Sequence, residues 1–185
     1  MIPGQRLNPN LFNSSIIPPD NYVRDKLTRD RDTKFDGSVW MCEVQGGRSV
    51  VLYPHSDPQA QVEVFAFAGI TEVSLAFDRL GQPLIAYVRA GQIYLYWFNS
   101  FTSSFEHKPI PGSMPYLTLD DRRDNQTTSY DVVLFYAQQG KLYHRLLRDR
   151  FETPYFSCDV PEGATHIAVA GLNNLCRFEL VFAGY

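Results

Sequence analysis

Two stretches of the chain share one pattern that decides the fold, LIAYVRAGQIY at residues 84–94 and VLFYAQQGKLY at residues 133–143. The second stretch repeats the first at an offset of 49 residues, with both tyrosines and the glycine in matching places. Each stretch is a hydrophobic run, a short segment ending in glycine and a second hydrophobic run. This pattern is typical of a β-hairpin, because glycine readily adopts the positive φ that a tight turn requires.

Strand signals continue on both sides of these hairpins. The runs are four to eight residues long, rich in β-branched and aromatic residues, and bounded by Gly, Pro, Asn or Asp. No stretch of the core shows a sustained helical period. The sequence predicts strands at Val39–Val44, Ser49–Tyr53, Gln61–Ala68, Glu72–Phe77, Pro83–Val88, Gln92–Phe98, Tyr116–Leu119, Val132–Ala137, Lys141–Leu147, Thr153–Cys158, His166–Ala170 and Arg177–Phe182.

The spacing indicates an all-β fold of repeated antiparallel hairpins in units of about 45–50 residues. Four strands in such a unit are typical of a propeller blade. Fewer than four full units fit into 185 residues, which is short for a closed propeller in one chain. The units therefore form either blades that close through other chains or a β-sandwich.

The predicted strand Gln92–Phe98 is apolar on both faces. A strand with one face in water would alternate, so both faces of this one should be covered by neighbouring blades or by a partner subunit. Its aromatic residues allow a second interpretation, in which they stack on a sugar or lie at an interface. The alternative is core packing, which the surrounding Ile93 and Leu95 favour. The candidates are Tyr94, Tyr96 and Trp97.

Residues 1–36 differ from the β domain that we expect at 37–185. They carry four prolines, a polar cluster and a run of alternating charges. The segment is either solvated tail or an extended N-terminal arm that orders against a neighbouring subunit. Apolar side chains favour the arm, and as its interface residues we expect Leu11, Phe12, Ile16, Ile17 and Tyr22.

Composition excludes several classes of protein. A formal net charge of -3 does not favour a nucleic-acid surface. No run approaches the roughly 18 apolar residues that span a membrane, and the first residues do not resemble a signal peptide. The three cysteines are far apart without a CxxC motif and are expected to be reduced thiols, although a bridge from Cys158 to Cys42 or Cys176 remains an alternative.

Candidate chemistry is sparse. The four histidines lie outside metal and protease motifs, so we expect no metal, no cofactor and no catalytic residues. His55-Ser56-Asp57 and the acidic stretch 120–125 are better explained as loops than as a triad or a cation site. An anion contact is possible at Arg145, Arg148 and Arg150, although an ion-paired hairpin edge through Asp149 explains these residues as well.

The segment DVVLFYAQQGKLYHRLLRDRF at residues 131–151 resembles a hairpin in virion structural proteins of tailed bacteriophages. The segment LAFDRLGQPLIAY at residues 75–87 is similar to the neighbouring hairpin of those proteins, so the resemblance covers roughly residues 73–156. It implies a structural protein of the phage tail and carries no catalytic residues.

From the resemblance we expect a virion protein made in the host cytoplasm. It would be a homo-oligomer in contact with other tail proteins at the tail tip, baseplate or fibre attachment, without nucleic acid or membrane insertion. The alternative is a receptor- or carbohydrate-binding module of the tail. A glycan-degrading enzyme ranks last, because no pair of facing carboxylates can be identified.

Overall fold

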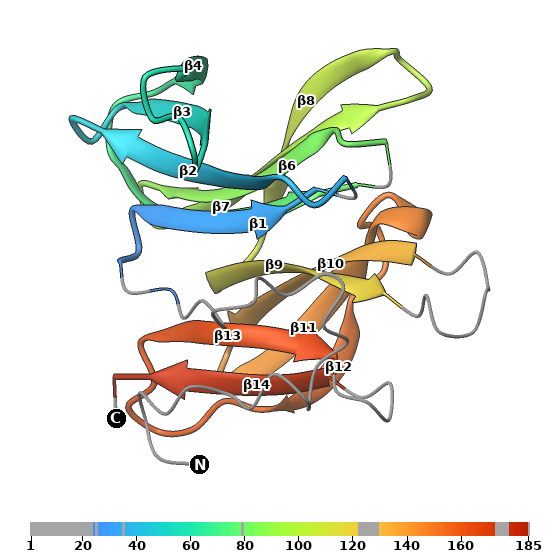
Figure 1. Ribbon diagram of the computed structural model, residues 1–185. Coiled ribbons are helices and arrows are strands. Elements are labelled where there is room, and N and C mark those ends of the chain that lie inside the picture. The colour runs from blue at the N-terminus through green and yellow to red at the C-terminus, as the bar shows by residue number, and fades with distance from the viewer. Residues whose placement is uncertain are drawn as a thin grey trace.

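The computed structural model describes residues 24, 26–34, 36–78, 80–121, 130–172 and 178–184 (Figure 1). In this part of the chain all strand pairs are antiparallel and neighbours in sequence, so each sheet is a simple meander. Three sheets have four strands and the fourth has two. The first sheet is β1 (Arg29–Thr33), β2 (Val39–Gln45), β3 (Ser49–Pro54) and β4 (Val62–Ala66); the second is β5 (Ile70–Phe77), β6 (Pro83–Arg89), β7 (Gln92–Asn99) and β8 (Ser104–Ile110). The third is β9 (Ser113–Asp121), β10 (Tyr130–Gln138), β11 (Lys141–Leu146) and β12 (Tyr155–Asp159), and the fourth is β13 (His166–Leu172) and β14 (Phe178–Ala183).

The predicted all-β fold of repeated hairpins is confirmed. The two matching stretches form the hairpins β6–β7 and β10–β11, which are the central strands of the second and third sheets. Their turns are equivalent, because Ala90 and Gly91 have φ of 51° and 74°, and Gln139 and Gly140 have φ of 53° and 73°. Two consecutive positive φ angles are characteristic of the type I′ turn, whose twist matches that of the paired strands.

Two strands were not predicted from the sequence, β1 and β8. The sequence of β1, RDRDT, has no apolar residue and gives no strand signal. The sequence of β8, SFEHKPI, contains Pro109, which an edge strand tolerates because one side of its backbone has no pairing partner. With β8 included, each of the two repeat units contains four strands, β5–β8 and β9–β12.

The four sheets follow one another with their first strands side by side. Strand β1 packs on β5, β5 on β9, and β9 on β13. Three apolar clusters fill the spaces between successive sheets. Figure 1 shows the sheets extending outward from these first strands. This arrangement resembles successive propeller blades, but the described strands do not form a closed propeller, since the fourth sheet has only two of them.

Strand β7 is covered on both faces, as its composition indicated. Tyr96 belongs to the cluster between the first and second sheets, whereas Trp97 belongs to the cluster between the second and third. Trp97 meets Phe151 edge to face at a ring distance of 6.0 Å. Adjacent residues of one strand therefore hold two different sheet interfaces together, because successive side chains point to opposite faces.

Polar side chains connect the first strands of the sheets. The carboxylate of Asp30 on β1 accepts hydrogen bonds from the Ser74 hydroxyl and the Leu75 N–H on β5, both at 2.8 Å. The Ser74 hydroxyl in turn accepts the N–H of Leu117 on β9 at 2.9 Å. Thr118 then donates to the carbonyl of Ala170 on β13 at 3.0 Å. These bonds satisfy backbone groups at the inner edge of each sheet, where no ladder partner is present.

Arg24 lies at the meeting point of three sheets and is only 2% exposed. Its guanidinium donates to the carbonyls of Val73, Pro115 and Ile167 at 2.9–3.2 Å. It also forms an ion pair with Glu72 at 2.9 Å. Its backbone N–H donates to the carbonyl of Ala168 at 3.1 Å. One side chain thus connects β5, β9 and β13, and the backbone N–H of Arg24 links the start of the described chain to β13.

Part of the predicted N-terminal arm, residues 1–36, lies within the β domain. Residues 26–34 form a turn and strand β1, so the C-terminal part of the segment 1–36 belongs to the first sheet. Asp30 is 2% exposed, although its sequence neighbours suggested a solvated run of charges. The anchor residues Leu11, Phe12, Ile16, Ile17 and Tyr22 lie outside the described residues, so an arm at these positions stays a prediction.

The two carboxylates of β1, of which Asp30 is buried and Asp32 half-buried, make stability depend on pH. Burial raises the pKa of Asp30, and burial together with the nearby Asp30 raises the pKa of Asp32 from 3.8 to about 7. A carboxyl with a higher pKa in the folded protein binds its proton more tightly there, so folding takes up protons between about pH 4 and 7. The free energy of unfolding therefore decreases as pH rises through this window.

Between pH 5 and pH 8, we expect Asp32 to change the free energy of unfolding by on the order of 2 kcal/mol. This figure is lower than 1.36 kcal/mol for each unit of the pKa shift would give, because the side chain is only partly buried and solvent screens its charge. Urea unfolding at pH 5 and pH 8 measures it, with Asp32→Asn as the variant. Asn retains an acceptor for the Phe77 N–H that Asp32 binds at 2.8 Å. The exposed Asp57→Asn is the control. An identical pH slope for wild type and Asp32→Asn would contradict this assignment.

Candidate functional sites

The described residues contain no group of three or more His, Cys, Asp or Glu side chains that could hold a metal ion. The stretch 120–125, considered as a cation site from sequence, lies largely outside them. His55-Ser56-Asp57 forms a turn, in which the Asp57 N–H donates to the Pro54 carbonyl at 3.0 Å. Cys42 is buried and Cys158 is half-buried, and both are free thiols, while Cys176 lies outside the described residues.

In the described part of the chain, no helix has the length and apolar character required to cross a membrane. The surface is instead marked by exposed apolar side chains on the outer strands. Strand β4 carries Val62, which is 62% exposed, and β12 carries Phe156, which is 57% exposed. Phe101, in the turn that leads into β8, is 79% exposed. Phe105 on β8 and Tyr155 on β12 are each 40% exposed, and we call these five side chains on or beside the outer strands the exposed rim.

An aromatic cluster lies between β4 and strands β6, β7 and β8 of the second sheet. Phe65 contacts the rings of Tyr87, Tyr96 and His107 at centroid distances of 4.9–5.0 Å. The Tyr87 hydroxyl lies 2.9 Å from Nδ1 of His107, and burial raises the pKa of Tyr87 to about 12. Phe105 stacks on Tyr96 at 4.7 Å.

The three aromatic residues singled out from sequence have different environments. Tyr96 and Trp97 are 9% and 5% exposed, so their rings pack inside the protein. Tyr94 is half-buried and stacks on Tyr87 at 5.4 Å. Among the three, Tyr94 therefore retains the largest accessible surface.

The three arginines suggested as an anion contact do not share one role. Arg145 donates to the carbonyls of Phe151 and Glu152 at 2.7 and 2.6 Å and to the Tyr136 hydroxyl at 3.1 Å. It thereby holds the segment that follows the 3-10 helix η3 (Leu147–Asp149). Arg150 lies over the ring of Phe101 at 4.9 Å, and Arg148 is exposed and has a partner of its own.

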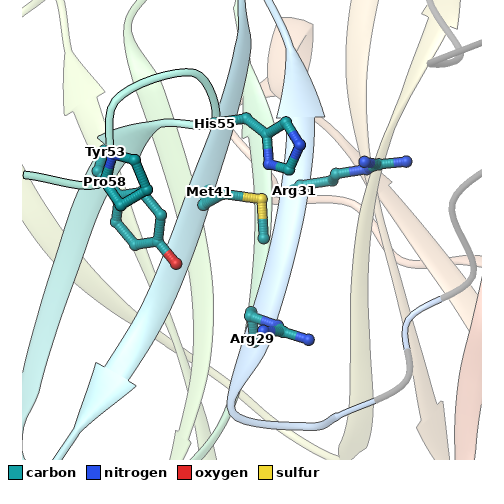
Figure 2. A pocket seen from close by; sticks show the side chains of 6 residues that line it. All are labelled: Arg29, Arg31, Met41, Tyr53, His55 and Pro58. Atoms are coloured by element: carbon teal, nitrogen blue, oxygen red, sulfur yellow. The ribbon is translucent and has the colours of Figure 1, made fainter.

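A pocket of about 360 Å³ opens on the face of the first sheet that is turned away from the second (Figure 2). Arg29 and Arg31 project from β1 on this face, and Asp30 between them points to β5, because side chains alternate along a strand. Met41 on β2 lies opposite Arg31 in the sheet and is 6% exposed, so it forms the floor. The lining is Arg29, Arg31, Met41, Tyr53, His55 and Pro58.

Figure 2 shows Tyr53 and Pro58 on one side of Met41 and the two arginines on the other. The Tyr53 hydroxyl donates to the Glu43 carboxylate at 3.1 Å, and burial together with this bond raises its pKa. Sequence reasoning missed this pocket, because β1 had not been identified as a strand. The alternation of Arg and Asp in RDRDT is the signal that could have indicated a strand with one cationic face.

No model of a protein family and no curated protein matches the chain.

Proposed function

We propose that this protein is a non-catalytic structural component of a bacteriophage tail that assembles through subunit contacts. The observation that carries the proposal is the exposed apolar rim on the outer strands, defined by Val62, Phe101, Phe105, Tyr155 and Phe156. Isolated proteins normally protect edge strands with charge or coverage, since bare edges pair with other chains. Apolar side chains on such edges mark surfaces for partners.

The sheet arrangement supports the same proposal. The fourth sheet has two described strands where the others have four, and β4, β8 and β12 are all edge strands. A two-stranded hairpin is marginally stable unless something packs on it. Strand addition from a neighbouring subunit would satisfy such edges, which is a common mode of assembly in β proteins.

The tail assignment itself rests on the resemblance of residues 131–151 to phage virion proteins. In the structure this segment comprises the hairpin β10–β11 and η3. The proposal covers three positions in the tail, which are the tail tip, the baseplate and the fibre attachment. We propose other tail proteins and further copies of this chain as the partners.

Tail incorporation tests the proposal, using phage particles that carry wild-type or altered gene copies. We expect Phe101→Ser combined with Phe156→Ser to lower the amount of protein in purified tails at least about fivefold. This change corresponds to roughly 1 kcal/mol of lost contact free energy, because about 1.4 kcal/mol changes an equilibrium tenfold. Quantitative mass spectrometry of the tails gives the readout. The control is Leu80→Ser, since Leu80 is 84% exposed but lies in the β5–β6 turn.

Deletion of residues 1–22 tests the arm separately. The deletion must end before Arg24, because this residue is buried among three sheets. We expect a folded chain that is lost from tails. Unchanged incorporation after this deletion would contradict the arm, and unchanged incorporation of the double Phe variant would contradict assembly through the outer strands.

A further inference from the structure

We propose that the outer edge of β8 pairs with the same edge of a second copy of this chain, antiparallel and centred on His107. The pairing rests on the assembly through subunit contacts proposed above and names one of its partners. Strand β8 is an outer strand of the second sheet, and among the described strands it pairs with β7 alone (Figure 1). A strand edge of this kind is a surface on which another chain can add a strand.

The hairpins of the second sheet determine which backbone groups lie on this edge. The turn between β6 and β7 has two residues, so the pair that closes it, Arg89 and Gln92, is hydrogen-bonded. Because hydrogen-bonded pairs alternate along antiparallel strands, the odd-numbered residues of β7 direct their backbone groups to β8. By the same alternation, the backbone groups of Phe105, His107 and Pro109 point away from β7. Pro109 fits this position, since it has no N–H to offer.

Two copies of this edge match each other when His107 of one copy lies opposite His107 of the other. Each His107 N–H then donates to the His107 carbonyl of the second copy. Each Phe105 N–H donates to the Pro109 carbonyl of the second copy, because Phe105 and Pro109 are equally far from His107 in the strand. Every N–H of the edge between Phe105 and Pro109 thereby gains an acceptor, and the proline supplies only its carbonyl.

The charges of β8 favour the same register. Glu106 and Lys108 lie on one face of the strand, since they are two residues apart. Centring on His107 sets Glu106 of each copy opposite Lys108 of the other, and cross-strand pairs of opposite charge are favourable. A pairing centred on Glu106 or on Lys108 would instead set like charges opposite each other, which is unfavourable.

Both charged side chains have the capacity for such a pair. Glu106 accepts hydrogen bonds from Asn99 and Thr102 at 3.0 and 2.6 Å, both through Oε1, one of its two carboxylate oxygens. Lys108 donates to Glu152 and to the Arg150 carbonyl at 2.6 and 2.9 Å. A lysine ammonium has three donors, so one remains for the carboxylate of the second copy.

The other face of β8 is aromatic. His107 meets the Phe65 ring of β4 at a ring distance of 5.0 Å, and Phe105 stacks on Tyr96 at 4.7 Å. Phe105 is nevertheless 40% exposed. In the paired strands it lies opposite Pro109 of the second copy, which covers part of this ring. The pairing therefore removes apolar surface of the exposed rim from water.

Sedimentation equilibrium of the full chain tests the pairing, because it measures mass in solution. We expect the wild type to reach twice the mass of one chain as its concentration is raised. Glu106→Lys and Lys108→Glu each set like charges opposite each other in both halves of the pair, so each should weaken the dimer about tenfold or more. The double variant restores opposite charges and should associate as the wild type does.

A mixture of the two single variants gives the sharpest result. Glu106→Lys has two positive charges on this face and Lys108→Glu has two negative charges. The two chains should therefore form a mixed dimer that is tighter than the dimer of either variant alone. The matched control is Glu63→Lys, which makes the same change of charge at an exposed position of the edge strand β4 and should associate as the wild type does.

A wild-type chain that stays a monomer at every concentration would overturn the pairing. Unchanged association of Glu106→Lys, or a mixture that stays monomeric, would overturn it as well. If a single variant loses the circular dichroism spectrum of the folded chain, the double variant decides, and its failure to associate counts against the pairing. A monomer that is found in tails would overturn only this pairing, whereas a dimer that is absent from tails would overturn only the tail assignment.

Discussion

Replacing Arg24 by methionine should lower the free energy of unfolding by about 3–5 kcal/mol, the range for breaking a buried ion pair from one side. The Met side chain is unbranched like that of Arg but carries no charge. The variant leaves Glu72 buried without its partner, and Glu72 is 7% exposed. Burial already raises the pKa of Glu72, and the attraction of Arg24 works against this rise. The loss of Arg24 should therefore raise that pKa further.

Three carbonyls lose their donor in the same variant, those of Val73, Pro115 and Ile167. Each belongs to a different part of the junction, so the expected effect is a global loss of stability and not a local one. Urea unfolding measures it. The matched control is Arg48→Met, which removes an exposed arginine from the β2–β3 turn and should cost less than about 0.5 kcal/mol.

A combined Arg24→Met and Glu72→Leu variant distinguishes the ion pair from the carbonyl contacts. If the buried charge of Glu72 causes most of the loss, the second substitution should recover part of it. Equal stability of Arg24→Met and Arg48→Met would show that Arg24 does not hold the sheets together.

Replacing Phe151 by alanine should cost about 3–5 kcal/mol, as expected for a large aromatic residue removed from a core. Phe151 is 0% exposed and lies in the cluster between the second and third sheets. Its ring meets Trp97 of β7 edge to face, whereas its own segment follows η3 in the repeat unit β9–β12. The substitution thus opens a cavity at the contact of two sheets.

Phe156→Ala is the control, because Phe156 is 57% exposed on β12. It removes the same atoms from the same repeat unit and should cost less than about 1 kcal/mol. Urea unfolding followed by tryptophan fluorescence reports both variants, since Trp97 lies against the Phe151 ring. Similar losses for the two would contradict the packing of the second sheet on the third.

The hairpins could be predicted from sequence because the information is local. Apolar runs and a glycine turn define β6–β7 and β10–β11, and both turns have the positive φ angles that the glycines suggested. The two-sided burial of β7 followed from the same reasoning, since a run without alternation needs cover on both faces.

The features that could not be predicted from sequence depend on contacts between residues far apart in the chain. Strand β1 has no apolar residue, and it is held by Asp30 and Asp32, which accept backbone N–H groups of β5. Arg24 looks like one charge among many in its segment, yet its partners lie 48–143 residues away. Neither spacing nor composition reveals such partners. The pocket was missed for the same reason, because its arginines are aligned only once β1 is a strand.

The protein composition of purified phage tails tests the proposed tail role most directly. The account predicts that the wild-type chain is present in tails in several copies per particle, and that the combined Phe101→Ser and Phe156→Ser chain is depleted while the Leu80→Ser chain is not. A wild-type chain that is absent from tails, or tails that take up all three chains equally, would contradict it.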